Sequence, residues 1–188
     1  MISFHFIELL INGLAAEDNR PVWLREMPSA SDNTALYYQF FHLLVQRIAP
    51  VRVLEIGTYL GSSACHFGYA NTGGLVRTID CDPEAKLAVE RAAAGRIFNI
   101  DAVTSDSLQW ARTHQEFYDI LFIDGQHTAY QAGLEYDAFR PLVRTDGIIF
   151  FDDIDLGDMP AFWNSVFDPK IRLDTLHYTG FGCCRVER

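Results

Sequence analysis

The stretch Val51-Arg-Val-Leu-Glu-Ile-Gly-Thr-Tyr-Leu-Gly-Ser-Ser63 decides the fold of this chain. Its first six residues are mostly apolar and short in extent, which predicts a buried strand at 51–56. Gly57 and Gly61 then predict a tight turn, and residues 62–69 have the pattern of a helix. A buried strand that enters a helix through a glycine turn is the opening unit of an α/β fold.

The same alternation continues toward the C-terminus. We expect strands at 75–79, 100–103, 118–123 and 147–151, and helices at 83–94, 107–112, 129–139 and 160–166. These strands are apolar almost throughout, which indicates a parallel sheet with helices on both faces. Only Gly180 separates the last two apolar runs, 171–179 and 181–186, so they are expected to form an antiparallel hairpin at one edge of the sheet. The predicted fold class is α/β, doubly wound.

Two amphipathic helices are expected ahead of the first strand, at residues 4–14 and 35–48. The sequence contains no internal repeat, charge block or low-complexity stretch, so nothing indicates a second domain. We therefore predict a single domain over residues 1–188, in which residues 1–34 form an N-terminal helical extension.

The composition excludes several classes of partner. The 188 residues are 49% hydrophobic, and 15 basic against 25 acidic residues give a net charge of −10. This balance argues against nucleic-acid or anionic-membrane partners. The four cysteines show no CxxC spacing and are interpreted as reduced thiols. No apolar run reaches the ~20 residues of a membrane span, and no signal peptide is expected. We expect a cytoplasmic protein.

Acidic residues follow the predicted strands at the edge where open parallel sheets bind ligands. They are Glu55, Asp80, Asp124, Asp152 and Asp153. The first turn lacks the three-glycine GxGxxG pattern of dinucleotide sites, because Tyr59 stands where the second glycine is needed. A pyrophosphate requires close backbone approach at that position, so nicotinamide and flavin dinucleotides are disfavoured.

The residues of this turn fit a different nucleoside. Asp80 ends the second strand, where a carboxylate accepts hydrogen bonds from both hydroxyls of a ribose. Glu55 repels a phosphate but attracts an ammonium group. A ribose with a cation and without phosphate is S-adenosylmethionine. The alternative is that Gly57 and Gly61 merely permit a strand-to-helix turn and that Asp80 is a solvated strand end.

Four segments, VLEIGTYLGSSA, RTIDCDPE, YDILFIDGQHTAY and GIIFFDDI, resemble the class I S-adenosylmethionine-dependent methyltransferases over residues 35–188. Within that class the chain is most similar to the catechol O-methyltransferase-like group and to small bacterial methyltransferases with a DGxHxxY element. The resemblance implies a mostly parallel, seven-stranded, Rossmann-like sheet with a C-terminal antiparallel hairpin. It does not explain the first 34 residues.

The resemblance also implies a set of cofactor-binding residues. They are Glu55, Gly57, Tyr59, Gly61 and Ser63 at the methionine end, Asp80 at the ribose, Ser107 near the adenine, and Asp124. The stretch Thr104-Ser-Asp-Ser107 departs from the glycine-containing loop usual in the family, which puts the adenine contacts in doubt.

Asp124, Asp152 and Asp153 are expected at the ends of neighbouring strands, where three carboxylates repel one another unless a cation compensates. Oxygen ligands of this kind suit Mg²⁺ or another hard divalent ion. The family resemblance implies metal ligands at these three positions, although the third is often an amide in the catechol enzymes. The alternative is that only Asp124 faces the cleft, while Asp152 and Asp153 begin the next loop and stabilise a turn.

His127 lies three residues after Asp124. The catechol enzymes carry a lysine at this offset that acts as general base, and a histidine is chemically competent for that task. A hydrogen-bonded surface histidine or a partner of a metal ligand is an equally good interpretation.

Together these features predict an S-adenosylmethionine-dependent methyltransferase that performs metal-assisted O-methylation of a small-molecule hydroxyl. Two alternatives stay open: a metal-independent N- or C-methyltransferase, and a protein that binds S-adenosylmethionine without turnover. Phe4, Phe6 and Trp23 of the N-terminal extension and the loop 155–159 are candidates to cover the acceptor. The shortness of the chain favours a shallow site or one completed by a second subunit, as in a homodimer.

Overall fold

The structure is a computed structural model that describes residues 2–14, 18–27, 36–96 and 98–188. Residues 1, 15–17 and 28–34 of the predicted N-terminal extension therefore lie outside the described residues. Within it, the structure shows helix α1 (Phe4–Gly13) and the short helix α2 (Val22–Arg25). The sequence analysis missed α2. None of the helices described is long and apolar enough to cross a membrane.

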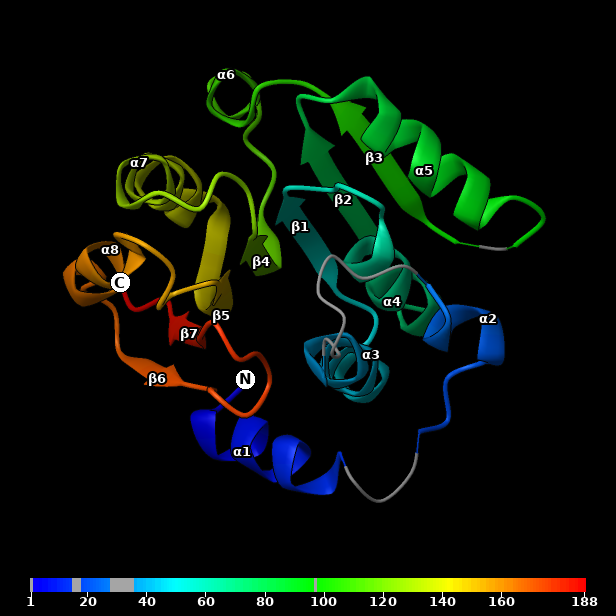
Figure 1. The fold of residues 1–188 in the computed structure, drawn as a ribbon, viewed down its shortest axis with the longest axis horizontal. Coiled ribbons are helices and arrows are strands. Elements are labelled where there is room, and N and C mark those ends of the chain that lie inside the picture. Colours follow the sequence, from blue (N-terminus) through cyan, green and yellow to red (C-terminus); the bar gives the residue numbers. More distant parts are fainter. Residues whose placement is uncertain (1, 15–17, 28–35, 97) are drawn as a thin grey trace.

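The described residues form one sheet of seven strands in the order β3-β2-β1-β4-β5-β7-β6 (Figure 1). The strands are β1 (Arg52–Ile56), β2 (Leu75–Asp80), β3 (Ile100–Thr104), β4 (Tyr118–Ile123), β5 (Val143–Asp152), β6 (Lys170–Arg172) and β7 (Phe181–Arg185). The first five run parallel, and β7 is antiparallel to both β5 and β6. The predicted fold is confirmed, including the antiparallel C-terminal edge.

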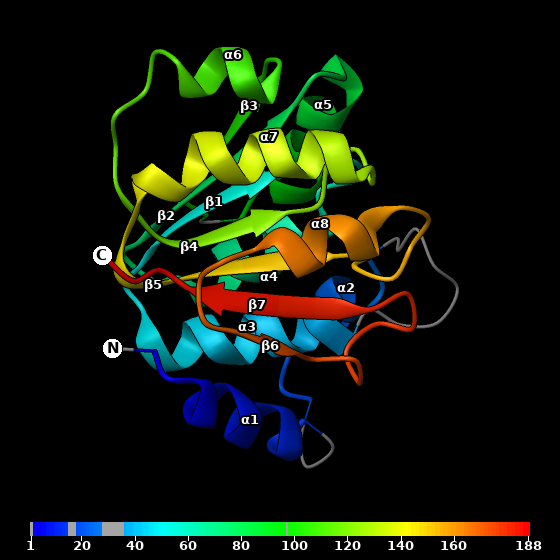
Figure 2. The same ribbon diagram turned by 90° about the vertical axis from the view of Figure 1, so that its left-hand side faces the viewer.

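Helices cover both faces of the sheet, as Figures 1 and 2 show. The helices α1, α3 (Leu36–Ile48), α4 (Ser62–Ala70) and α5 (Pro83–Ala93) pack on one face, whereas α6 (Ser107–Ala111), α7 (Ala129–Phe139) and α8 (Met159–Ser165) pack on the other. A short 3₁₀ turn, η1 (Arg140–Leu142), leads from α7 into β5. The layers are those of a doubly wound α/β domain.

Side chains alternate between the two faces of the sheet along each strand, so the core consists of two clusters, one on each face. In β5, Ile148 and Phe150 belong to the cluster under α3, and Ile149 and Phe151 belong to the cluster under α7 and α8. All four are fully buried. A parallel strand that is buried on both faces needs apolar residues at every position, and this explains the continuous apolar runs in the sequence.

The last hairpin differs from the prediction. Residues 171–179 were expected to form a strand, but β6 ends at Arg172, and residues 173–180 form a loop before β7. Two successive turns build the loop, because the Leu176 amide donates to the Leu173 carbonyl and the Gly180 amide donates to the His177 carbonyl. Leu173 and Leu176 are apolar because they fold back into the core. The loop returns to the edge of the sheet where the parallel strands end.

Candidate active site

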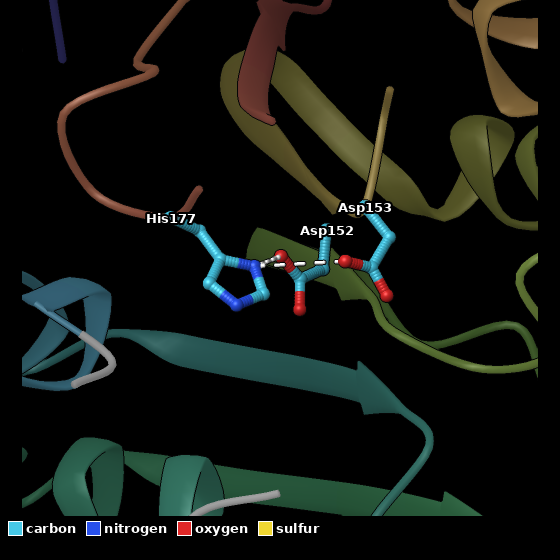
Figure 3. A group of neighbouring side chains, drawn as sticks. All are labelled: Asp152, Asp153 and His177. Atoms are coloured by element: carbon cyan, nitrogen blue, oxygen red, sulfur yellow. Dashed lines mark hydrogen bonds and ion pairs between the residues drawn. The ribbon is translucent and has the colours of Figure 1, made fainter. Parts of the chain in front are cut away.

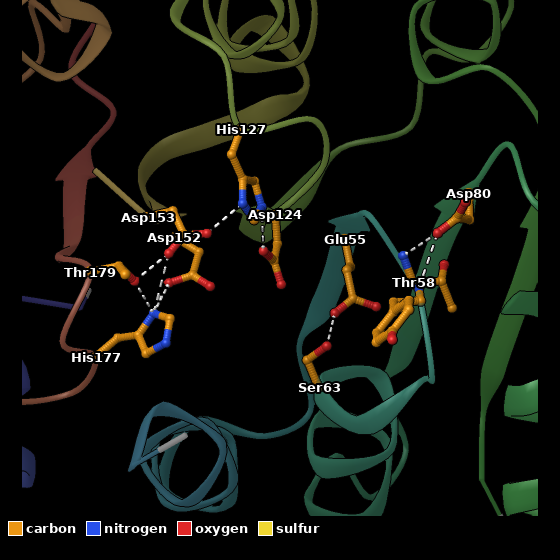
Figure 4. A network of polar contacts seen from close by, with 11 residues as sticks. Glu55, Thr58, Ser63, Asp80, Asp124, His127, Asp152, Asp153, His177 and Thr179 are labelled. Atoms are coloured by element: carbon orange, nitrogen blue, oxygen red, sulfur yellow. Dashed lines mark hydrogen bonds and ion pairs between the residues drawn. The ribbon is translucent and has the colours of Figure 1, made fainter. Parts of the chain in front are cut away.

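A cleft of about 710 Å³ opens at the carboxyl ends of the parallel strands. Residues that follow β1, β2, β3, β4 and β5 line it, together with Tyr37 and Tyr38 of α3 and His177 of the C-terminal loop. Figure 4 shows two groups of polar side chains in this region, one around Asp80 and one around Asp153. The cleft lies where parallel sheets of this kind bind ligands.

The turn after β1 requires glycine at two positions. Gly57 has a φ of 94°, and a Cβ atom there would lie 1.9 Å from the carbonyl oxygen of Asp124. Gly61 has a φ of 77°, and its Cβ atom would lie 2.6 Å from a methyl group of Val89. Tyr59 also adopts a positive φ, of 44°, and its side chain is 63% exposed at the cleft. The turn is therefore held against the end of β4 and against α5.

Asp80 supports this turn from the end of β2. Its Oδ2 atom accepts hydrogen bonds from the amides of Thr58, at 2.9 Å, and Tyr59, at 3.0 Å. Its Oδ1 atom accepts from the amide of Asp82 at 2.9 Å. Oδ2 thus already accepts two hydrogen bonds, whereas Oδ1 accepts one and keeps capacity for a further donor. Asp80 thus shapes the turn, and its predicted contact with a ribose stays a prediction.

Glu55 lies beneath the turn and is fully buried. It accepts hydrogen bonds from the hydroxyls of Ser63 and Thr78. Burial raises the pKa of Glu55 to about 7, although these two hydrogen bonds favour the ionised form. Ser63 lines the cleft, and its hydrogen bond to Glu55 connects the buried carboxyl group to the cleft. The sequence analysis placed both residues at the methionine end, and the structure brings them together.

Ser107 begins helix α6 and lines the cleft. Its hydroxyl donates a hydrogen bond of 2.7 Å to Oε1 of Glu135 in α7. Asp106 precedes it as the N-cap and accepts from the amide of Gln109. The sequence analysis did not identify Glu135, because 28 residues separate it from Ser107 along the chain.

On the other side of the cleft, Asp124 and His127 follow β4. Burial and the charge of Asp152 raise the pKa of Asp124 well above its ordinary value. The Nε2 atom of His127 lies 3.1 Å from Oδ1 of Asp124, and Nδ1 forms an ion pair with Asp153 (Figure 4). The hydrogen bond to Asp124, the larger effect, and the hydrogen bond to Asp153 raise the pKa of His127 to about 10. His127 therefore lies between two of the predicted metal ligands, which stabilise its protonated form.

Asp152 ends β5, Asp153 follows it, and both form a compact group with His177 (Figure 3). Nδ1 of His177 donates to Oδ1 of Asp152 at 2.7 Å and lies 3.6 Å from Oδ1 of Asp153. One potential ligand atom from each of the three residues lies within 4.8 Å of the other two. Burial lowers the pKa of His177, but the hydrogen bond to Asp152 and the charges of both acids outweigh it and raise the pKa.

This arrangement differs in part from the predicted set of three aspartates. Two of them, Asp152 and Asp153, come together as expected, and their partner in the group is His177 rather than Asp124. Asp124 lines the same cleft but bonds to His127. The sequence analysis missed His177 because it placed residue 177 within a strand. The signal available was a histidine two residues before Thr179, near the glycine at position 180.

Comparison with known proteins agrees with this geometry. A family model described as "Methyltransferase domain" matches residues 54–154. O-methyltransferase ankF of Aspergillus thermomutatus is 33% identical over 109 residues, which are 54% of this chain and 45% of that protein. The probable caffeoyl-CoA O-methyltransferase 3 of Dictyostelium discoideum is 29% identical over 128 residues, or 62% of this chain and 49% of that protein. The chain thus spans about half the length of these curated relatives.

Solved structures share the fold over the whole chain. The O-methyltransferase TomG of Streptomyces achromogenes, in complex with S-adenosylmethionine, has a TM-score of 0.74 at 17% identity and full coverage of both chains. The Podospora anserina methyltransferase PaMTH1, bound to S-adenosylhomocysteine, has a TM-score of 0.73 at 14% identity, with coverage of 100% of this chain and 98% of that one. At these identities the likeness is one of fold.

Proposed function

Since the chain belongs to the methyltransferase-domain family, we propose that it is an S-adenosylmethionine-dependent O-methyltransferase acting on a hydroxyl of a small molecule. The observation that carries the proposal is the division of one cleft into two halves. One half is the glycine turn with Asp80, and the other is the group of acids and histidines around Asp153. The family and the named relatives support the choice of reaction.

In the cofactor half, we assign the methionine end to Gly57, Tyr59, Gly61 and Ser63, with Glu55 behind Ser63. The ribose is assigned to Asp80, the adenine to the start of α6 at Ser107, and Asp124 to the boundary with the acceptor half. The backbone of a glycine turn allows a ligand to approach closely, and Asp80 fixes that turn through two amides. This half needs no phosphate-binding element.

The residues of the acceptor half fit a divalent metal ion. Asp152, Asp153 and His177 offer two carboxylates and one imidazole whose ligand atoms lie within 4.8 Å of one another, and Asp124 lies in the same cleft. Nδ1 is the ring nitrogen of His177 that faces both acids, at 2.7 Å from Oδ1 of Asp152 and 3.6 Å from Oδ1 of Asp153. Carboxylates alone suit Mg²⁺, and the imidazole also admits Mn²⁺ or Zn²⁺. When bound, such an ion lowers the pKa of a hydroxyl that it contacts.

Methyl transfer from a sulfonium is a direct displacement, so the chain must align the acceptor oxygen with the methyl group. We place the acceptor hydroxyl in the half of the cleft that Asp124, Asp152 and Asp153 line, beside the methionine end of the cofactor half. His127 lies within reach of both acids and is the candidate to take the hydroxyl proton. It acts as a base only in its neutral form, because the cation that the two acids stabilise carries no free lone pair for a proton.

One observation favours a metal-independent alternative. His127 bridges Asp124 and Asp153, and its protonated form supplies positive charge where an ion would act. An enzyme of this kind would use the same cofactor half without a metal.

We also assign the protein to the cytoplasm and to a single domain over residues 1–188. The homodimer and the covering role of residues 1–34 stay predictions.

The proposal is tested by methyl transfer from labelled S-adenosylmethionine to a panel of phenols, catechols and amines, with Mg²⁺ or Mn²⁺ and separately with EDTA. We expect O-methylated products that disappear in EDTA. Full O-methylation in EDTA would refute the metal requirement but would still support the O-methyltransferase activity. Products methylated only at nitrogen or carbon would refute the O-methyltransferase assignment.

A further inference from the structure

Glu135 of α7 is a buried carboxylate with one satisfied and one unsatisfied oxygen. The residue is 3% exposed, and it lines the cleft. Oε1 accepts hydrogen bonds from the Ser107 hydroxyl, at 2.7 Å, and from the side-chain amide of Gln131, at 2.9 Å. Oε2 is buried and has no hydrogen-bond partner among the described residues. Two donors thus fix the carboxylate and leave its second oxygen vacant.

A vacant buried oxygen on a carboxylate is costly, and native proteins usually provide it with a donor. Burial raises the pKa of Glu135, as expected for a carboxyl group that lacks a compensating charge. Oε2 faces the loop after β4, where a Cβ atom on Gly125 would lie 3.3 Å away. Gly125 and Glu135 both line the cleft, so the buried Oε2 lies beside it. A donor from a bound ligand would complete the site.

The identity of that donor follows from the position of Glu135 in the cleft and rests on the proposed function. The glycine turn faces the methionine end and Asp80 faces the ribose, whereas Glu135 is tied to Ser107 at the start of α6. The adenine is the remaining part of the cofactor, so it is assigned to the end of the cleft at Ser107 and Glu135. The 6-amino group is the only strong hydrogen-bond donor of an adenine joined to ribose, since its ring nitrogens only accept.

We propose that Oε2 of Glu135 accepts a hydrogen bond from the 6-amino group of the adenine of S-adenosylmethionine and thereby selects adenine over other purines. Ser107 and Gln131 are positioning residues, because they hold Oε1 and leave Oε2 as the acceptor. The sequence stretch 104–107 lacks the family's usual glycine, and a side chain from α7 takes over recognition of the base. A site built to accept from an amino group rejects the analogue that lacks it.

Asp106 is the competing acceptor at this end of the cleft. It is exposed, and Oδ1 already accepts from the amide of Gln109 at 2.8 Å as the cap of α6. Asparagine also caps helices well, so Asp106→Asn preserves the helix while it removes the charge. This substitution is the matched control for Glu135→Gln, since each replaces one carboxylate with an amide.

The first experiment uses the unmodified protein and needs no variant. Calorimetry compares S-adenosylhomocysteine with its analogue in which an unsubstituted purine replaces adenine. We expect the analogue to bind about tenfold or more weakly, the scale for one unpaired buried acceptor. Equal binding of the two, within about twofold, would overturn the proposal. Failure of both to bind would refute the proposed function itself.

The second experiment reverses the preference. In Glu135→Gln the amide oxygen can keep the bonds from Ser107 and Gln131, which places an NH₂ group where Oε2 was. We expect weaker binding of S-adenosylhomocysteine and stronger binding of S-inosylhomocysteine, whose 6-oxo group accepts. Melting temperatures confirm that each variant is folded. If Asp106→Asn loses the discrimination and Glu135→Gln keeps it, the acceptor is Asp106 and the proposal is wrong.

Discussion

Nε2 of His127 lies 3.1 Å from Oδ1 of Asp124, the acid three residues before it. In the sequence, the offset of three residues from Asp124 suggested that His127 is a general base. In the structure, His127 and Asp124 form an ion pair. The other ring nitrogen pairs with Asp153, so both nitrogens are engaged by carboxylates. His127 therefore links the end of β4 to the end of β5, across the acceptor half of the cleft.

Replacement of His127 by alanine tests its role in proton transfer. We expect turnover to fall by roughly 10²–10⁴-fold, the scale for loss of a general base, with nearly unchanged affinity for S-adenosylhomocysteine. Steady-state kinetics and calorimetry give the two values separately. Normal turnover in His127→Ala would show that the ion pairs are structural. A lower melting temperature with proportionate loss of both functions would show the same.

Metal binding is tested without an acceptor. Calorimetry with Mn²⁺ is expected to show one site in the protein, and Asp152→Asn and His177→Ala should each weaken it by at least about tenfold. Asp155→Asn is the control, because this exposed acid on the following loop pairs with Arg172 instead. Affinity for S-adenosylhomocysteine should persist in EDTA. Equal Mn²⁺ affinity in all four proteins would place the ion elsewhere.

The two glycines at positions 57 and 133 are expected to respond oppositely to alanine. Gly57→Ala places a Cβ atom 1.9 Å from the Asp124 carbonyl oxygen, and we expect a loss of at least about 2 kcal/mol of folding free energy. Gly133 lies within α7 with no atom near its Cβ position, so Gly133→Ala should stabilise by about 0.5–1 kcal/mol. Urea denaturation measures both. A tolerated Gly57→Ala would contradict the close approach of the first turn to β4.

The buried histidines His42 and His66 should each weaken the fold in mild acid. Burial, together with the charge of Arg20, lowers the pKa of His66 from its ordinary 6.5 to about 3, and burial lowers that of His42 to about 4. Below pH 6.5 the unfolded chain therefore binds protons at these two histidines that the folded chain does not, so their contribution to stability decreases as the pH falls. Near pH 5 each histidine should cost about 1–2 kcal/mol. His66→Gln should flatten the decline between pH 7 and 5 in urea titrations, and an unchanged slope would contradict this.

The sequence predicted the strands and their acids because both depend on local pattern. Apolar runs set β1 to β5, and the acids follow from the chain direction at the ends of those strands. His177 and Glu135 were missed for a different reason. His177 reaches Asp152 only because residues 173–180 turn twice, and Glu135 meets Ser107 only when α7 packs beside α6. Contacts of this kind depend on packing and leave no periodic signal.

Titration of the purified protein with S-adenosylhomocysteine in EDTA, followed by calorimetry, tests the central claim most directly. We expect saturable binding at one site, no binding of NAD, and a loss of about 1–3 kcal/mol of binding free energy in Asp80→Ala. Tight binding of NAD, with no response to S-adenosylhomocysteine, would contradict the account.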